Sequence, residues 1–146
     1  MGKIEPEAEA LDLPANRHVL ATLARSAQPA RSEYRLRAFE QLTHPDVCER
    51  LAQVAEGGQP VVAYGRCARA APDGTLYAIG LGTGVIALRL PEGAARGAVL
   101  ANGGKLDPDL GSDWVLADAW LSEVLRADGT ALLASWIEVA RLASNA

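Results

Sequence analysis

The spacing of apolar positions along the chain changes near residue 60, from intervals of three and four residues to intervals of two. In the first part, Val19, Leu20 and Leu23 fall on one helical face, and this spacing predicts a helix over about residues 14–26. From Val61 onward, the period of two is typical of strands. The pattern therefore divides the chain into a helical segment and a segment built around a sheet.

A second helix is predicted after Thr43-His44-Pro45-Asp46, which offers a hydroxyl group as N-cap and a proline where no intrahelical hydrogen bond is lost. Gly57-Gly58 ends this helix, because glycine is the usual residue just beyond a helix C-terminus. Between the two helices, residues 34–42 fit both a strand and a helix, and the greater extent of the helical spacing favours a helix. The buried stripe of the second helix is predicted to consist of Val47, Leu51, Val54 and Ala55.

The middle of the chain predicts an antiparallel meander. Extended segments near 61–70, 74–81 and 85–90 are separated by Pro72-Asp73-Gly74 and Gly82-Thr83-Gly84, which both suit tight turns. Short turns join antiparallel neighbours, so the three segments are expected to pair in sequence order. The side chains predicted to share one face of the second strand are Tyr77, Ile79 and Leu81.

The last third of the chain predicts a helix, a strand and a helix. A short helix over about 91–101 contains two glycines, so packing against the sheet must stabilise it. After a loop over 106–112, Trp114 and the residues that follow it predict a fourth strand near 113–117. A final helix over 130–144 is expected to point Leu132, Leu133, Trp136, Ile137, Ala140 and Ala143 inward.

These elements predict an α+β fold, in which an antiparallel sheet of about four strands is flanked by helices and preceded by an N-terminal helical segment. The length of 146 residues suits one domain. We expect residues 1–12 to form a flexible acidic tail. Residues 13–58 then form the helical segment and residues 59–146 the α+β core, and the two are expected to pack as one compact unit.

The amino-acid composition excludes several classes of protein. Hydrophobic residues make up 49% of the chain and charged residues 22%, which is not the composition of a disordered protein. Two cysteines cannot build a disulfide framework, and no apolar run is long enough for a membrane span. The chain begins with acidic residues rather than with the apolar core of a secretory signal. We therefore expect a soluble, cytoplasmic protein without membrane contact.

The charge balance argues against a dedicated nucleic-acid module. The net charge is −4, whereas neutralisation of phosphates calls for a surplus of basic residues. Two stretches contrast locally: residues 17–37 carry five arginines and one acid, and residues 107–128 carry six acids and one arginine. We interpret them as solvated faces that complement each other within the fold or across a homodimer.

Between Val61 and Ala143 the chain carries a series of short motifs in a fixed order: Tyr64-Gly65-Arg66-Cys67-Ala68-Arg69, Thr75–Ala78, Ile86–Glu92, Asn102-Gly103-Gly104, Leu110–Val115 and the closing helix. In their order and spacing, these motifs resemble the MmcQ/YjbR-like family. This resemblance implies a compact α+β domain with an antiparallel sheet, and members are often described as DNA-binding because their hairpins resemble wings. The family has no agreed catalytic residues, and the longer N-terminal segment and the net acidity depart from its pattern.

Three arginines on the predicted strands form the candidate binding surface. Arg66, Arg69 and Arg89 would donate charge-assisted hydrogen bonds to phosphates if DNA were the ligand. On a strand, however, Arg66 and Arg69 point to opposite faces, because three residues separate them. We therefore expect at most one of them to lie beside Cys67, and a reactive Cys67 thiol is the less favoured interpretation.

The remaining patterns are interpreted as structural. Gly80, Gly82 and Gly84 precede a strand rather than the helix that a phosphate loop needs, so they predict a turn. Gly103-Gly104-Lys105 precedes leucine and fails the Walker pattern, and Asp107 and Asp109 suit a solvated turn. The chain's potential His and Cys metal ligands are His18, His44, Cys48 and Cys67.

His44 and Cys48 lie four residues apart on one predicted helix, but the chain contains neither a CxxC nor an HxxxH pair. We therefore predict no metal or cofactor and expect Cys48 and Cys67 to be small buried hydrophobes. Core positions are also the default for the three tryptophans, and exposure of one of them would mark a pocket or a partner surface. These tryptophans are Trp114, Trp120 and Trp136.

The function predicted first is a non-enzymatic binding domain of the YjbR-like kind, whose partner the sequence does not name. The alternative is a protein-interaction role, as a homodimer or as a neutralising partner, through residues 17–37 or residues 107–128. A small enzyme ranks third, because histidines and polar clusters are scarce.

Overall fold

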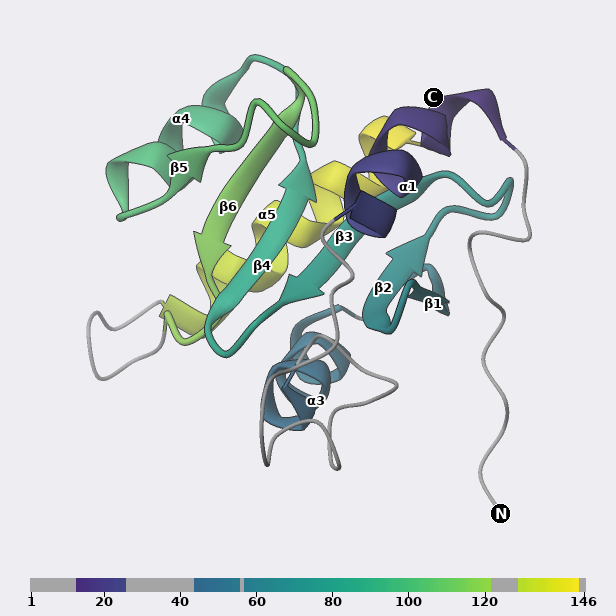
Figure 1. Ribbon diagram of the computed structural model, residues 1–146. Coiled ribbons are helices and arrows are strands. Elements are labelled where there is room, and N and C mark those ends of the chain that lie inside the picture. The colour runs from purple at the N-terminus through teal and green to yellow at the C-terminus, as the bar shows by residue number, and fades with distance from the viewer. Residues whose placement is uncertain (1–12, 26–43, 56, 122–128, 145–146) are drawn as a thin grey trace.

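The computed structural model describes residues 13–25, 44–55, 57–121 and 129–144 (Figure 1). The described residues form helices on both faces of one antiparallel sheet, which confirms the predicted α+β class. The predicted tail over 1–12 and the predicted helix over 34–42 lie outside the described residues. None of the described helices is both long and apolar enough to cross a membrane.

The sheet has six strands in the order β1-β2-β3-β4-β6-β5, and every neighbouring pair is antiparallel. The strands are β1 (Gln59–Ala63), β2 (Arg66–Ala70), β3 (Leu76–Leu81), β4 (Val85–Arg89), β5 (Lys105–Leu106) and β6 (Trp114–Asp118). The described helices are α1 (Pro14–Arg25), α3 (Pro45–Val54), α4 (Ala94–Ala101) and α5 (Gly129–Ser144).

The prediction of one strand near 61–70 is wrong. The segment forms two strands, β1 and β2, which a two-residue turn at Tyr64-Gly65 joins into a hairpin. Tyr64 and Gly65 both have positive φ, 47° and 76°. Such turns match the right-handed twist of the flanking strands and are therefore favoured in hairpins. The sequence pattern missed this turn because tyrosine rarely adopts a left-handed conformation.

The prediction that Tyr77 shares a face with Ile79 and Leu81 is also wrong. Arg69 pairs with Ala78 and Ala70 pairs with Leu76, so Tyr77 is an extra residue in β3. This β-bulge breaks the alternation and moves Tyr77 to the face opposite Ile79.

Three further details differ from the predictions. Leu106, predicted as the first residue of a loop, pairs with β6 instead and forms the short edge strand β5 together with Lys105. The N-cap of α3 is His44 rather than a hydroxyl residue, because His44 Nδ1 accepts a hydrogen bond from the Asp46 N–H at 3.0 Å. In α5, Ala143 is exposed rather than inward.

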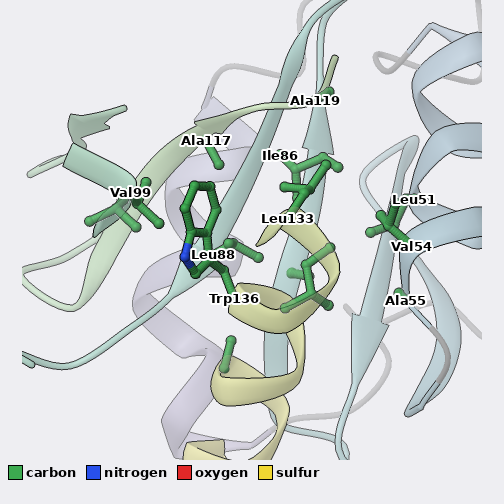
Figure 2. Packing of buried hydrophobic residues seen from close by; sticks show 14 of the residues in the cluster. Leu51, Val54, Ala55, Ile86, Leu88, Val99, Ala117, Ala119, Leu133 and Trp136 are labelled. Carbon is green, nitrogen blue, oxygen red and sulfur yellow. The ribbon is translucent and has the colours of Figure 1, made fainter. Parts of the chain in front are cut away.

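Helices cover the two faces of the sheet unequally (Figure 1). On one face, which we call the α3/α5 face, the predicted α3 stripe is buried together with side chains of α5 and α4. Figure 2 shows Leu133 and Trp136 of α5 among the buried residues of this cluster, close to Ile86 and Leu88 of β4. Arg50 holds α3 in place by donating to the carbonyl oxygens of Ala119 at 2.8 Å and Leu121 at 2.6 Å.

On the other face, which we call the α1 face, Val19, Leu20 and Leu23 of α1 pack against the sheet. The fully buried Asn16 fixes the position of this helix. Its amide donates to the Gly74 carbonyl at 2.9 Å and accepts from the Leu76 N–H at 2.9 Å. A single polar side chain therefore joins the first helix to the β2–β3 turn.

Candidate functional site

Arg66, the first of the three candidate arginines, is a structural residue on the α1 face. It is 5% exposed, and its Nη1 donates to the carbonyl oxygens of Leu23 at 3.3 Å and Tyr64 at 3.2 Å. The Leu23 carbonyl lies in the last turn of α1, where main-chain oxygens lack helical partners and a positive charge is favourable. Burial lowers the pKa of Arg66. Its guanidinium is thus used to fix the end of α1.

Arg89 has a similar role at the other end of α1. Its Nε donates to the Leu76 carbonyl at 2.9 Å, and its Nη2 donates to the Ala15 carbonyl at 3.1 Å. The guanidinium also lies over the ring of Trp114, 5.0 Å from the ring centroid. Burial lowers the pKa of Arg89, and the nearby charge of Asp113 opposes this shift.

Arg69 points away from the other two arginines, to the α3/α5 face, as its pairing with the core residue Ala78 shows. The expectation that Arg66 and Arg69 face opposite sides is thereby confirmed. Arg69 is half-buried, and it makes no hydrogen bond or ion pair with the residues that the structure describes. The three arginines therefore do not form one surface.

Arg69 lines a cavity of about 210 Å³ between α3 and the β1–β2 hairpin, which we call the hairpin cavity. Arg66 also borders it, although the Arg66 guanidinium is hydrogen-bonded to the end of α1. The cavity walls combine apolar side chains, two thiols and one guanidinium. The lining side chains that matter for its chemistry are Cys48, Leu51 and Ala52 of α3, Val62 of β1, and Cys67 and Arg69 of β2.

Sequence reasoning missed that the two cysteines share this cavity. Both are reduced thiols, and both are half-buried rather than fully buried as expected, although Cys67 does pack against the apolar core of the α3/α5 face. Cys67 lies two residues before Arg69 on β2, so the two side chains share a face. Cys48 comes from the opposite wall, where α3 passes the hairpin. Only the packing of α3 on the sheet brings the thiols together, and no local pattern reports such packing.

A second cavity of about 300 Å³, which we call the Tyr77 cavity, lies where the end of α3 meets β3 and α5. Tyr77 donates its hydroxyl to the Gly57 carbonyl at 3.0 Å. Burial raises the pKa of Tyr77, while the positive charges of Arg69 and Arg141 lower it. The charge of Arg69 therefore acts on the Tyr77 cavity as well as on the hairpin cavity.

The position of the Tyr77 hydroxyl requires a glycine at position 58. Gly58 has a φ of +80°, and a Cβ atom there would lie 1.9 Å from the Tyr77 hydroxyl. On the α5 side, Arg141 forms a bidentate ion pair with Glu138, with Nε–Oε1 and Nη2–Oε2 distances of 2.5 and 2.7 Å. This pairing lowers the pKa of Glu138. Arg141 is thus engaged, in contrast to Arg69.

The two histidines, which are the other potential metal ligands, make contacts outside the hairpin cavity. The Nδ1 atom of His44 caps α3, and His18 Nε2 lies 2.9 Å from the Asp109 carbonyl. In the described ranges, no three His, Cys, Asp or Glu side chains gather as a metal site would require. Asp107, considered above as a turn residue, accepts hydrogen bonds from the N–H groups of Asp109 and Leu110.

The two oppositely charged stretches meet within the chain where the structure describes them. Thr22 of α1 donates its hydroxyl to the Asp109 carbonyl at 2.9 Å, and His18 contacts the same oxygen. These contacts use a hydroxyl, an imidazole and a main-chain carbonyl rather than a pair of opposite charges, so the predicted charge complementarity stays a prediction. Residues 26–37 and 122–128 of the stretches lie outside the described residues.

The tryptophans divide between core and surface. Trp114 and Trp136 are buried, with exposed fractions of 2% and 4%, as expected for core residues. Trp120 is 42% exposed, and its indole N–H donates to the Thr83 carbonyl at 2.9 Å. None of the three lines the hairpin cavity or the Tyr77 cavity.

Comparisons of the chain with protein-family models, with curated proteins and with solved structures gave no match. The resemblance to the MmcQ/YjbR-like family therefore stays a prediction from the sequence.

Proposed function

We propose that the protein is a binding domain of the MmcQ/YjbR kind, and that it receives an anionic group of its ligand at Arg69. The single observation that supports this proposal is the contrast among the three strand arginines. Arg66 and Arg89 donate to main-chain carbonyls, whereas Arg69 lines a cavity without an internal partner among the described residues.

The chemistry of the hairpin cavity narrows the ligand class. A planar guanidinium suits a carboxylate or a phosphate, because it can donate two parallel hydrogen bonds. The neighbouring walls include Leu51 and Val62, which favour an apolar group next to the anion. At about 210 Å³, the cavity is smaller than the roughly 300–1,000 Å³ typical of sites for drug-sized ligands. It therefore suits a small acid or one acidic side chain of a larger partner.

Nucleic acid ranks second as a ligand. Duplex DNA is bound by neutralising several phosphates at once, and this requires several cations on one surface. Two of the three candidate arginines are engaged with α1, and the net charge of the chain is −4. A small acidic ligand, which needs only one arginine, therefore agrees better than DNA with the single candidate arginine that is not engaged with α1.

The proposal is tested with butyrate and acetate as probes, by following the side-chain Nε–H signals of the arginines in NMR spectra. Butyrate should shift the Arg69 signal saturably and bind about tenfold more tightly than acetate, because burial of each methylene contributes about 0.8 kcal/mol. The Arg69→Gln variant should lose binding. The matched control is Arg25→Gln, since Arg25 is exposed on α1, and it should bind normally.

Two results would contradict the proposal. The first is a butyrate affinity that Arg69→Gln leaves unchanged. The second is retention of a duplex oligonucleotide at low salt with an affinity that falls steeply as salt is added, because this outcome would assign the protein to the nucleic-acid alternative.

A further inference from the structure

We infer that the hairpin cavity is also a site of reversible thiol modification, at which Cys67 exchanges with a small anionic disulfide. The inference rests on the proposed function in one respect, since Arg69 would hold the anionic group of the reagent. Its own basis is the placement of the two thiols. Neither the family resemblance nor the proposed ligand binding requires a cysteine in the cavity.

Accessibility is the first condition for such a site. Cys67 is half-buried rather than enclosed, and its side chain lines a cavity that opens to solvent. Cys48 lines the opposite wall, so that a small molecule in the cavity has a thiol on either side. A reagent held in this space is therefore within reach of a nucleophilic sulfur.

Charge is the second condition, and it selects Cys67 over Cys48. The attacking species in disulfide exchange is the thiolate, and a neighbouring arginine favours it. Arg69 lies on the same face of β2 as Cys67, two residues away, whereas Arg66 points to the α1 face. The same guanidinium would hold a carboxylate of the reagent, so one charge both activates the sulfur and positions its target.

The bonds and electrons of the disulfide exchange balance without any further reagent. The Cys67 thiolate attacks one sulfur of the small disulfide, a new S–S bond forms at Cys67, and the disulfide bond of the reagent breaks. The reagent's other sulfur leaves as a thiolate and takes up a proton. The small disulfide is thus the oxidant, and an excess of the small thiol reverses the step.

The test compares dithiodiglycolate, a small disulfide with two carboxylates, with the neutral bis(2-hydroxyethyl) disulfide of similar size, using intact-protein mass spectrometry over time. Cys67 should gain one thioglycolate group. The ratio of the dithiodiglycolate rate to the neutral-reagent rate should fall about fivefold in Arg69→Gln, the loss expected for one partly exposed ion pair. The Arg25→Gln variant should keep the wild-type ratio. The Cys48→Ser variant should still be modified, and Cys67→Ser should not be modified in the cavity.

A measurement on the unaltered protein guards against variants that fold poorly. Butyrate, by occupying Arg69, should slow modification by dithiodiglycolate more strongly than it slows modification by the neutral disulfide. The inference would be overturned if modification fell on Cys48. It would also be overturned if neither Arg69→Gln nor butyrate changed the ratio of the two rates. If butyrate binds at Arg69 while Cys67 stays unmodified, the inference fails and the proposed function stands. If Arg69 binds no butyrate in the NMR titration, the proposed function fails instead.

Discussion

The two faces of the sheet use the same amino acid in different ways. On the α1 face, Arg66 and Arg89 each donate to main-chain carbonyls of α1 and of nearby strand residues. On the α3/α5 face, Arg69 has no such acceptor among the described residues and borders a cavity instead. Because Arg66 and Arg69 stand on one strand, their difference comes from the face each occupies and from the helix that covers it.

This contrast shows how a helix end can determine the role of a strand residue. The last carbonyls of α1 lack helical partners, and Arg66 supplies a donor to one of them. Among the described residues, Arg69 makes no comparable contact with a helix. The helices on its side are held by apolar packing and by Arg50. The following predictions test the contrast, from the largest expected effect to the smallest.

Asn16 should be the most sensitive residue of the α1 face. The Asn16→Ala variant removes the buried side-chain amide and leaves the Gly74 carbonyl and the Leu76 N–H without their hydrogen-bond partner. We expect the free energy of unfolding to fall by about 3 kcal/mol, measured by urea denaturation. Thr22→Ala, which removes a more exposed contact on the same helix, serves as the control. A loss at Asn16 no larger than that at Thr22 would refute this account of how α1 is held.

Substitution of Arg89 should cause the second-largest loss in the free energy of unfolding. Arg89→Met keeps the length of the side chain but removes its donors to Leu76 and Ala15 and its charge over Trp114. We expect a loss of about 2 kcal/mol in urea denaturation. Arg96→Met removes one exposed bond, to the Ser112 carbonyl, and should be nearly neutral. Equal losses in the two variants would show that the α1 face does not depend on its arginine.

Tyr77 makes stability depend on pH in the alkaline range. Because burial raises its pKa in the folded state, the neutral hydroxyl is favoured by folding. The stabilisation that comes from the neutral Tyr77 hydroxyl is complete below the pKa of about 10 that tyrosine has in the unfolded chain. It is lost as the pH rises through the higher pKa of the folded state. Tyr77→Phe should lose about 1 kcal/mol at neutral pH with the bond to Gly57, and should show a smaller alkaline decline. If the stabilities of the wild type and Tyr77→Phe declined in parallel above pH 10, the alkaline decline would not come from Tyr77.

Arg69 should have the smallest effect on stability. The Arg69→Gln variant removes no hydrogen bond or ion pair to a described residue, so we expect a change within about 0.5 kcal/mol in the same denaturation assay. Its effect should appear in ligand binding instead. A loss comparable to that of Arg89→Met would mean that Arg69 is a structural residue like the other two.

The fold class could be predicted from the sequence because periodicity reports local conformation. The α1 and α3 stripes, the Pro72-Asp73-Gly74 turn and the strand near Trp114 all depend on neighbouring residues. The Tyr64-Gly65 turn and the Tyr77 bulge could not be predicted in this way. Both break the period for only one or two residues, and their conformations are fixed by strand partners rather than by neighbours in sequence.

The candidate site could be predicted only in part. Strand alternation correctly separates Arg66 from Arg69, since parity along a strand is local. It cannot reveal that the Leu23 carbonyl, 43 residues away, is a partner of Arg66. The shared cavity of Cys48 and Cys67 depends on the docking of α3, which is likewise a contact between distant segments. The types of side chain could thus be recognised in advance, but their partners could not.

The amide of Asn16 also bears on the order of folding. It joins residues 58 positions apart, and a contact of such separation cannot form until a long loop has closed. Its acceptor, the Gly74 carbonyl, belongs to a turn between strands that pair locally and can form early. The α1 helix should therefore dock after the central strands have paired, and amide hydrogens of α1 should exchange with solvent before those of the central strands.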